Sequence, residues 1–336
     1  MIHPLKLDSL TLDSNIIYAP LAGCSDYPFR MIAARYKPAL MFCEMVKMEA
    51  LIRNDSGTYR LLDYHESMRP IGAQLCGSNP TLAGPCAAII EELGFDVVDL
   101  NCGCPVDKVT KDGSGSGLLK HPERIGEIIH EMKKAVSIPV TLKIRAGWDD
   151  TTINAPAIAC IAREAGAAMI TVHGRTREQR YKGLASRDHI AATKRAAGDM
   201  IVIGNGDLFD GEAALSMLEE TACDGVLISR GTIGKPWIAE DIKRAARGEK
   251  PLVFSGEAYR QLLLDHLDET IAYQPERRAI LDMRRVGCWY LKSGRGTKRL
   301  REGMSRAKSI DEVRALIDAY DWESASCGAS AFANRQ

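Results

Sequence analysis

Short apolar runs alternate with longer amphipathic segments along the first 250 residues of the chain. The runs suit buried strands and fall at 16–20, 40–45, 71–76, 96–101, 139–145, 168–173, 200–205 and 224–229. The segments between them space apolar residues three and four apart and predict helices over Asn79–Leu93, His121–Val136, Thr152–Ala165, Arg187–Ala197, Gly211–Glu220 and Pro236–Arg247. Eight such units predict a TIM barrel over residues 1–248. The first loop lacks the Gly-x-Gly-x-x-Gly of a dinucleotide-binding fold.

The alternation of strand and helix stops after residue 250. Residues 257–273, 276–293 and 310–322 have helical spacing of apolar positions, so we predict a small helical domain over 249–322. The tail 323–336 consists mainly of small and polar residues, and we expect it to be disordered.

Polar residues end five neighbouring strands of the predicted barrel. Side chains alternate between two faces of a strand, so Val140, Leu142 and Ile144 pack under the helices while Lys143 and Arg145 reach the mouth. The same alternation turns other polar side chains to the mouth: Gln74, Asn101, His173 and Asn205. One such residue alone would be read as a structural partner, whereas five strands together predict a polar pocket at the end where barrel active sites lie.

The two cysteines of "NCGC" (101–104) could be metal ligands, a redox couple, packing residues or a catalytic acid. By alternation Cys102 faces away from the mouth and packs, whereas Cys104 lies in the loop over the mouth. A zinc site would need further ligands beside this pair, but the sequence has no Cys-x-x-Cys motif and no histidine close to it. We therefore expect no metal ion.

Glycine-rich loops follow the last two predicted strands, "NGDLFDG" (205–211) and "ISRGTIGKPW" (228–237). Loops at these positions of a barrel commonly bind phosphate, so they predict a phosphorylated ligand; the alternative is that both are only tight turns. The segment "GSGSG" (113–117) lacks the Lys-Ser/Thr of a phosphate-binding Walker loop, and we interpret it as part of a flexible lid.

Amino-acid composition limits the class of protein and its cellular compartment, but it does not identify a function. The 336 residues include 44 basic and 44 acidic side chains, which argues against a general nucleic-acid coat but leaves a local basic patch open. No apolar run approaches the roughly 20 residues of a membrane span. Ten cysteines without a secretory leader indicate reduced thiols and a cytoplasmic protein.

Seven motifs in order resemble the tRNA-dihydrouridine synthases, and the pattern is most similar to the bacterial B type. They are "APLAGCSDYPFR" (19–30), "AQLCGSNP" (73–80), "DLNCGCPVDKV" (99–109), "TLKIRAGWD" (141–149), "TVHGRTREQ" (171–179), "IGNGD" (203–207) and "RGTIGKPW" (230–237). The resemblance implies an FMN-binding barrel and a C-terminal tRNA-binding domain. It also implies reduction of the C5=C6 bond of a uridine in tRNA, with NADPH or NADH as electron source.

The same resemblance implies roles for individual residues. Cys104 matches the proton donor, and Asn101 and Arg145 lie where the uracil would be recognised. The implied FMN contacts are Pro20, Leu21, Ala22, Gln74, Lys143, His173, Asn205, Gly206, Asp207, Ser229 and Arg230. Two positions depart from the family pattern, since many relatives have Met in place of Leu21 and Gly in place of Ser229.

A basic patch in the predicted helical domain supports RNA binding. Between residues 277 and 308 the acidic residues are Asp282 and Glu302, and Trp289 and Tyr290 are interleaved. The basic residues are Arg277, Arg278, Arg284, Arg285, Lys292, Arg295, Lys298, Arg299, Arg301, Arg306 and Lys308. A solvated helix face remains the alternative for the patch, and core packing for the aromatic pair.

Three other functions remain open at this point. They are a dihydroorotate dehydrogenase-like flavoenzyme, a Schiff-base aldolase that would use Lys143, and a barrel that only binds RNA. The sequence leaves the oligomeric state undetermined, with a monomer favoured.

Overall fold

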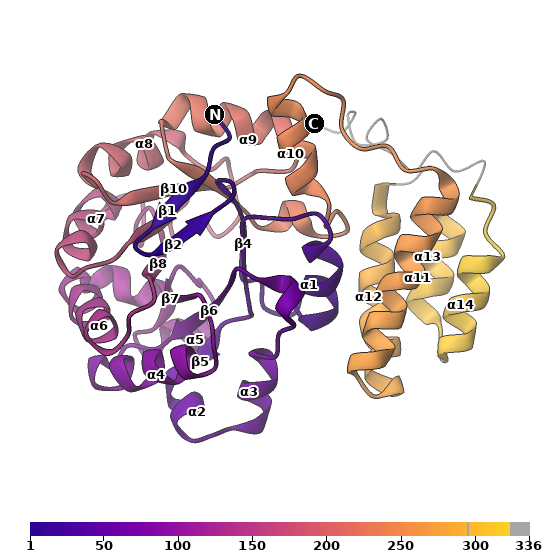
Figure 1. Ribbon diagram of the computed structural model, residues 1–336, viewed down its shortest axis with the longest axis horizontal. Helices are drawn as coiled ribbons and strands as arrows, with labels where there is room; N and C mark the ends of the chain where they lie inside the picture. The colour runs from indigo at the N-terminus through magenta and orange to yellow at the C-terminus, as the bar shows by residue number, and fades with distance from the viewer. Residues whose placement is uncertain (294–295, 323–336) are drawn as a thin grey trace.

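The computed structural model describes residues 1–293 and 296–322 and contains an eight-stranded parallel barrel (Figure 1). Its strands are β3 (Ile16–Tyr18), β4 (Leu40–Phe42), β6 (Ile71–Cys76), β7 (Val97–Cys102), β8 (Val140–Arg145), β9 (Met169–His173), β10 (Ile201–Asn205) and β11 (Gly225–Ile228). The barrel closes because β4 pairs with both β3 and β6. The predicted TIM barrel is confirmed. The predicted run 40–45 is too long, since β4 stops at Phe42, and the short strand β5 (Val46–Lys47), which was not predicted, pairs with β6.

Each of the six predicted barrel helices is present. They are α4 (Pro80–Glu92), α6 (Pro122–Ala135), α7 (Ala155–Glu164), α8 (Arg187–Ala196), α9 (Gly211–Thr221) and α10 (Ile238–Ala246). Helix α7 begins three residues later than predicted because Asp149 accepts hydrogen bonds from Thr151 and Thr152 and keeps this segment in a turn. At other helices, the side chain just before the first turn accepts a backbone N–H and so defines where the helix begins. Asn79 does this for α4 and Asp210 for α9.

Several short elements were not predicted. They are the strands β1 (Leu5–Leu7) and β2 (Leu10–Leu12), the helices α1 (Tyr27–Ala34), α2 (Met48–Ile52), α3 (Ser56–Leu61) and α5 (Asp107–Thr110), and the 3-10 turns Glu66–Met68, Gly115–Lys120 and Arg230–Thr232. The signals for α1 are in the sequence, because Asp26 caps its first turn and Pro28 stands at its start.

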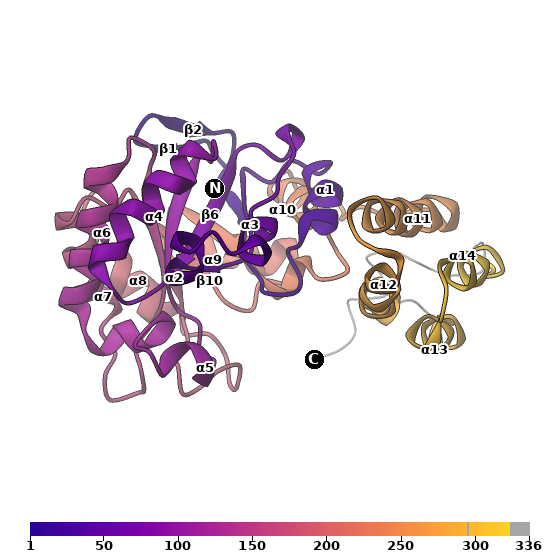
Figure 2. The same ribbon diagram turned by 90° about the horizontal axis from the view of Figure 1, so that it is seen from below.

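The hairpin of β1 and β2 closes the N-terminal end of the barrel. Leu7 and Leu12 pack with Val97, Met169 and Ile203, whose side chains fill the barrel interior. Figure 2 shows this hairpin and α5 at opposite ends of the barrel. Since the amino ends of the strands are plugged, the carboxyl ends form the open mouth.

The strand residues of the opposite face pack under the helices. Leu100, Cys102 and Ile144 are fully buried in one apolar cluster with residues of α4 and α6. The predicted alternation in β7 and β8 is therefore confirmed, and it is what turns Asn101 and Lys143 toward the mouth.

Four helices follow the barrel and share their own core: α11 (Gly256–Tyr273), α12 (Glu276–Tyr290), α13 (Lys298–Arg306) and α14 (Ile310–Asp318). They lie beside the barrel in both ribbon views (Figures 1 and 2). Helix α13 was not predicted. The predicted boundary after residue 248 falls between α10 and α11, and the predicted tail 323–336 lies outside the described residues.

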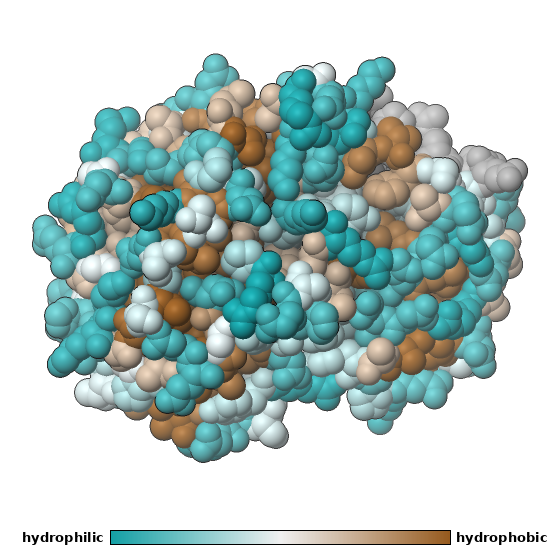
Figure 3. Space-filling model, viewed as in Figure 1, coloured by the Kyte–Doolittle hydropathy of each residue, from teal (hydrophilic) through white to brown (hydrophobic). Residues whose placement is uncertain are grey.

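Specific contacts join the helices to the barrel. Ile32 of α1 and Trp237 belong to the same apolar core as α11 and α12. The rings of Tyr27 and Tyr273 stack with centroids 4.5 Å apart, and Arg60 donates a hydrogen bond to the Tyr273 carbonyl at 2.8 Å. In the view of Figure 3, hydrophilic residues separate the exposed apolar patches on both parts of the molecule.

Candidate active site

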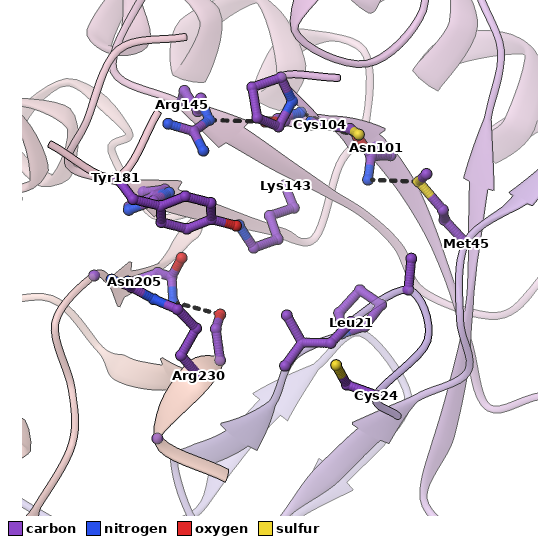
Figure 4. Close-up of a pocket in the computed structure, with 18 of the residues that line it drawn as sticks. Leu21, Cys24, Met45, Asn101, Cys104, Lys143, Arg145, Tyr181, Asn205 and Arg230 are labelled. Atoms are coloured by element: carbon purple, nitrogen blue, oxygen red, sulfur yellow. Dashed lines mark hydrogen bonds between the residues drawn. The ribbon is translucent and has the colours of Figure 1, made fainter. Parts of the chain in front are cut away.

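A cavity of 350 Å³ opens at the carboxyl ends of the barrel strands (Figure 4). This volume is in the range of small-molecule sites. Every residue that the sequence placed in a site lines it: Pro20, Leu21, Ala22, Gln74, Asn101, Cys104, Lys143, Arg145, His173, Asn205, Gly206, Asp207, Ser229 and Arg230. The sequence did not single out Tyr181, which also lines the cavity and lies across its mouth in Figure 4.

A buried chain of hydrogen bonds lies at the base of the cavity. Asn101 donates to the Gln74 carbonyl oxygen at 2.7 Å, and Gln74 donates to the Asp99 carboxylate at 2.8 Å. Thr141 donates to the other Asp99 oxygen at 2.6 Å. Burial raises the pKa of Asp99 to about 6. This chain fixes the orientation of both amides, since each has a defined donor and acceptor end.

The loop that carries Cys104 is held from two sides. The side-chain oxygen of Asn101 accepts the backbone N–H groups of Gly103 at 3.2 Å and Cys104 at 2.9 Å. Ser116 donates to the Cys104 carbonyl from its backbone N–H at 3.1 Å and from its hydroxyl at 2.9 Å. The Cys104 thiol is half-buried at the edge of the cavity, whereas Cys102 is fully buried behind the strand.

The prediction of a flexible lid at 113–117 is wrong. Residues 114–117 are buried, and Gly115 has φ of +58° and packs against Cys104. A Cβ atom at Gly115 would lie 2.9 Å from the Cys104 carbonyl oxygen, so only glycine fits there. The segment is a support beneath the Cys104 loop.

Cationic side chains surround the cavity. Burial, together with Arg145, lowers the pKa of Lys143 to about 8. Arg145 is buried and donates to the Gly103 carbonyl from Nε and to the Thr176 carbonyl from Nη1, both at 2.8 Å. Burial and these cations lower the pKa of His173 well below its usual range, so His173 is neutral at pH 7. The cavity therefore favours an anionic or electron-rich ligand.

A buried ion pair organises the side of the cavity formed by β9 and β10. Arg175, which is 2% exposed, donates to Asp207 at 2.7 Å, and Arg230 donates to the other Asp207 oxygen at 3.1 Å. Asp207 has φ of +54° after Gly206 at +126°, so the chain turns sharply here. The Asp207 carboxylate is thus engaged by two arginines and by the Ala185 N–H, so it joins the loops that follow β9, β10 and β11.

The sequence did not single out several further residues of this site: Cys24, Met45, Val106, Tyr181, Leu208 and Phe209 line the cavity, and Arg175 pairs with Asp207. Arg175 lies within the motif "TVHGRTREQ" that carried the resemblance, so the motif itself was the signal. Tyr181 follows two residues after that motif, and nothing in its spacing marked it.

Other classes of site are not found in the described part of the chain. Within residues 1–293 and 296–322, no three His, Cys, Asp or Glu side chains gather so that they could hold a metal ion. None of the helices in these ranges has the length and apolarity needed to cross a membrane.

Comparison with known proteins identifies the family. The family described as "Dihydrouridine synthase (Dus)" matches residues 17–324. "Probable tRNA-dihydrouridine synthase 1" of Synechocystis sp. is 37% identical over 94% of this chain and 88% of its own length. "tRNA-dihydrouridine synthase B" of Pseudomonas aeruginosa is 33% identical over 94% of this chain and 95% of its own length.

A solved structure supports the fold independently. Histamine dehydrogenase from Rhizobium sp. 4-9 superposes with a TM-score of 0.57 at 12% identity, over 78% of this chain and 50% of that one. At this identity the likeness supports only the barrel fold. The match to the family over residues 17–324 and the relatives that cover nearly the whole chain show that this protein belongs to the dihydrouridine synthase family.

Proposed function

We propose that this protein reduces the C5=C6 bond of a uridine in tRNA, with FMN as cofactor and NADPH or NADH as electron source. The observation that carries the proposal is the cavity at the mouth of a dihydrouridine synthase barrel, in which a half-buried cysteine, Cys104, faces the same space as Lys143 and Asn101. The alternatives of a dihydroorotate dehydrogenase-like enzyme or an aldolase leave the four C-terminal helices, which the family match includes, without a role.

The residues of the cavity fit FMN. At one end, Gly206 and Gly231 let the loops after β10 and β11 pack closely, because a Cβ atom at Gly206 would collide with Ala185 and one at Gly231 with the Leu208 carbonyl. Ser229 stands beside Arg230 at a position where many relatives have glycine. Its hydroxyl oxygen accepts a hydrogen bond from Asn205 at 3.1 Å, so this loop accommodates the serine. These loops would bind the phosphate through backbone N–H groups and Arg230.

The other end of the cavity fits the flavin ring. Pro20, Leu21 and Ala22 offer an apolar surface, and Gln74 and Lys143 face it across the cavity. His173 completes the polar edge of this region. Bound between these residues, FMN would supply the hydride for C6 of the uracil, with NADPH or NADH as the electron source.

The chain's own residues supply charge and a proton. The Lys143 ammonium group would stabilise negative charge on a ligand bound beside it. Burial, together with Arg145, lowers its pKa, so the charged form lacks a sufficient counter-charge within the protein. Cys104 gives its thiol proton to C5 of the uracil, and solvent reprotonates the thiolate.

Asn101 and Arg145 are placed to orient the uracil. The Nη2 atom of Arg145 makes no hydrogen bond within residues 1–293 and 296–322, while its Nε and Nη1 are engaged by carbonyl groups. One guanidinium nitrogen therefore remains for a base carbonyl. Because the cavity lies inside the barrel mouth, the uridine must leave its stack to enter.

The C-terminal helices are proposed to bind tRNA. Tyr290 is buried in their core beside His266, so it packs rather than stacks on bases, and Arg285 covers Trp289. Arg295 lies outside the described residues. Among residues 1–293 and 296–322, no carboxylate pairs with six exposed cations of these helices: Arg277, Lys292, Lys298, Arg299, Arg306 and Lys308. Exposed cations without partners suit phosphate contacts.

The proposal is tested by mapping dihydrouridine in tRNA from cells with and without this protein. We expect one or more dihydrouridine positions to disappear without it. The purified full chain should also carry FMN and convert uridine in an unmodified tRNA transcript when NADPH or NADH is supplied. An unchanged dihydrouridine map together with a flavin-free, inactive purified protein would refute the proposal.

A further inference from the structure

Four large apolar side chains stand exposed around the cavity mouth. They are Val106, Tyr181, Leu184 and Phe209, and we call them the apolar rim. They come from three loops, which follow β7, β9 and β10. Val106, Tyr181 and Phe209 line the cavity, and Leu184 lies next to Ala185, whose N–H binds Asp207 of the cavity wall. Exposed apolar residues gathered at one place mark an interaction surface.

Leu184 is held in position although its side chain is 84% exposed. The carbonyl of Gly183 accepts a hydrogen bond from Arg175, and the N–H of Ala185 donates to Asp207 at 2.9 Å. Both neighbours of Leu184 are thus anchored to the buried Arg175–Asp207 pair. The leucine is therefore presented to solvent from a fixed backbone.

A cation lies between the two aromatic rings of the rim. The Arg230 guanidinium is 4.5 Å from the centre of the Tyr181 ring and 5.3 Å from that of the Phe209 ring. Flat aromatic and guanidinium groups are the surfaces on which unpaired bases stack. A nucleic-acid base has a flat face that suits this surface.

Basic residues flank the rim on the same loop. Lys182 is exposed beside Tyr181, and the Arg180 side chain is 58% exposed. Arg177 and Arg180 both pair with Asp107, which is itself exposed next to Val106. Apolar side chains between cations match a ligand that alternates flat bases with phosphates, which is unpaired RNA.

We propose that the apolar rim binds the unstacked nucleotides on either side of the target uridine. This inference rests on the proposed function, since a uridine drawn into the cavity leaves its neighbours without a stacking partner. The bases would lie on Leu184, Phe209 and the Tyr181 ring, with their phosphates against Arg180 and Lys182. The rim would then stabilise the extruded uridine by replacing the lost stacking.

The test compares Leu184→Ala and Phe209→Ala with Leu93→Ala. Leu93 is a matched control, because it is exposed at the end of α4 that leads into β7 and so lies at the plugged end of the barrel. Each rim variant should raise the Kd for an unmodified tRNA transcript at least about fivefold and raise KM for dihydrouridine formation. FMN content and the rate of flavin reduction by NADPH should stay at the parent values in Leu184→Ala and Leu93→Ala, neither of which lines the cavity.

Two results would overturn the proposal. In one, both rim variants bind the transcript as tightly as the parent and Leu93→Ala. In the other, tRNA binding is unchanged but flavin reduction slows, which would assign the rim to the nicotinamide donor. A parent protein that carries no FMN and forms no dihydrouridine would instead refute the proposed function, and this is measured before the variants are compared.

Discussion

The side-chain oxygen of Asn101 accepts the backbone N–H of Cys104 at 2.9 Å, while its amide nitrogen donates to Gln74 at 2.7 Å. Both ends of the Asn101 amide are thus engaged before any substrate arrives. Asn101 therefore positions the Cys104 loop, in addition to the contact with the uracil that the resemblance implies. The thiol is placed by a chain of hydrogen bonds that ends at the buried Asp99.

The first prediction separates the two neighbouring cysteines. Cys104→Ala should retain FMN but lose dihydrouridine formation by about 100-fold or more, because the general acid is removed. Cys102→Ala should keep this activity and lose about 1 kcal/mol of unfolding free energy, because a small cavity opens behind β7. Single-turnover assays and urea unfolding of both variants measure this. Parent-like activity in Cys104→Ala would refute its role as the acid.

The positions of the strand-end residues around the cavity could be predicted because they depend on local patterns. Alternation along β7 and β8 separates Asn101 from Cys102 and Lys143 from Ile144, and each strand holds this pattern without help from the rest of the chain. The positions of the polar strand ends follow from the barrel itself.

The missed parts depend on contacts between distant segments. Arg175 meets Asp207 only because β9 and β10 are neighbours, so although Arg175 stands in a recognisable motif, nothing in its own loop marks Asp207 as its partner. The GSGSG segment has the composition of a mobile loop, but Ser116 and Gly115 pack against Cys104, so the structure gives it a supporting role. The plug formed by β1 and β2 likewise needs the assembled barrel interior.

The second prediction concerns the pH dependence of stability. The Asp99 carboxyl has an ordinary pKa near 4 when unfolded, and burial raises it to about 6 in the fold. The protonated form therefore stabilises the fold below pH 4, and this contribution is lost as pH rises from 4 to 6. Asp99→Asn lacks the titration, so its unfolding free energy relative to the parent should rise by about 2 to 3 kcal/mol between pH 4 and pH 7.

Urea unfolding of both proteins at pH 4, 5.5 and 7 measures this difference. Asp26, whose pKa burial also raises to about 6, is present in both proteins and cancels in the comparison. A difference between Asp99→Asn and the parent that is constant over this pH range would contradict the prediction.

The third prediction is that Lys143 costs stability in the flavin-free protein. Its pKa is lowered to about 8, so the charged form is unfavourable in the fold below pH 8, and the cost shrinks between pH 8 and the unfolded value near 10.4. Lys143→Met should raise the Tm at pH 7, with a smaller gain at pH 9.5, and should weaken FMN binding. Lys134→Met, at an exposed site on α6, is the control. Equal Tm values for Lys143→Met and parent at pH 7 would contradict this.

The fourth prediction compares two substitutions of Asp207. Asp207→Ala leaves the buried Arg175 without its carboxylate and places alanine at φ of +54°, so the unfolding free energy should fall by about 3 kcal/mol. Asp207→Asn keeps an acceptor oxygen and tolerates this backbone conformation, so it should lose less. FMN affinity, measured by fluorescence titration, should be highest in the parent, lower in Asp207→Asn and lowest in Asp207→Ala. An alanine variant as stable as the asparagine variant would argue against the ion pair.

The last prediction concerns the exposed cations of α13. Lys298 and Arg299 are exposed at its start and face no carboxylate among residues 1–293 and 296–322. If they contact phosphates, the double variant Lys298→Gln/Arg299→Gln should bind tRNA more weakly, and the slope of log Kd against log salt should fall by about 0.7 to 0.9 per lost contact.

The matched control for this pair is Lys6→Gln/Lys134→Gln, two exposed lysines on β1 and at the end of α6, away from the barrel mouth. It removes the same formal charge, so any effect of net charge alone would appear equally in both double variants. Salt titrations of tRNA binding at fixed pH distinguish the two cases, and FMN content should match the parent in both. Equal salt slopes in the two double variants would show that α13 attracts RNA only through overall charge, without direct phosphate contacts.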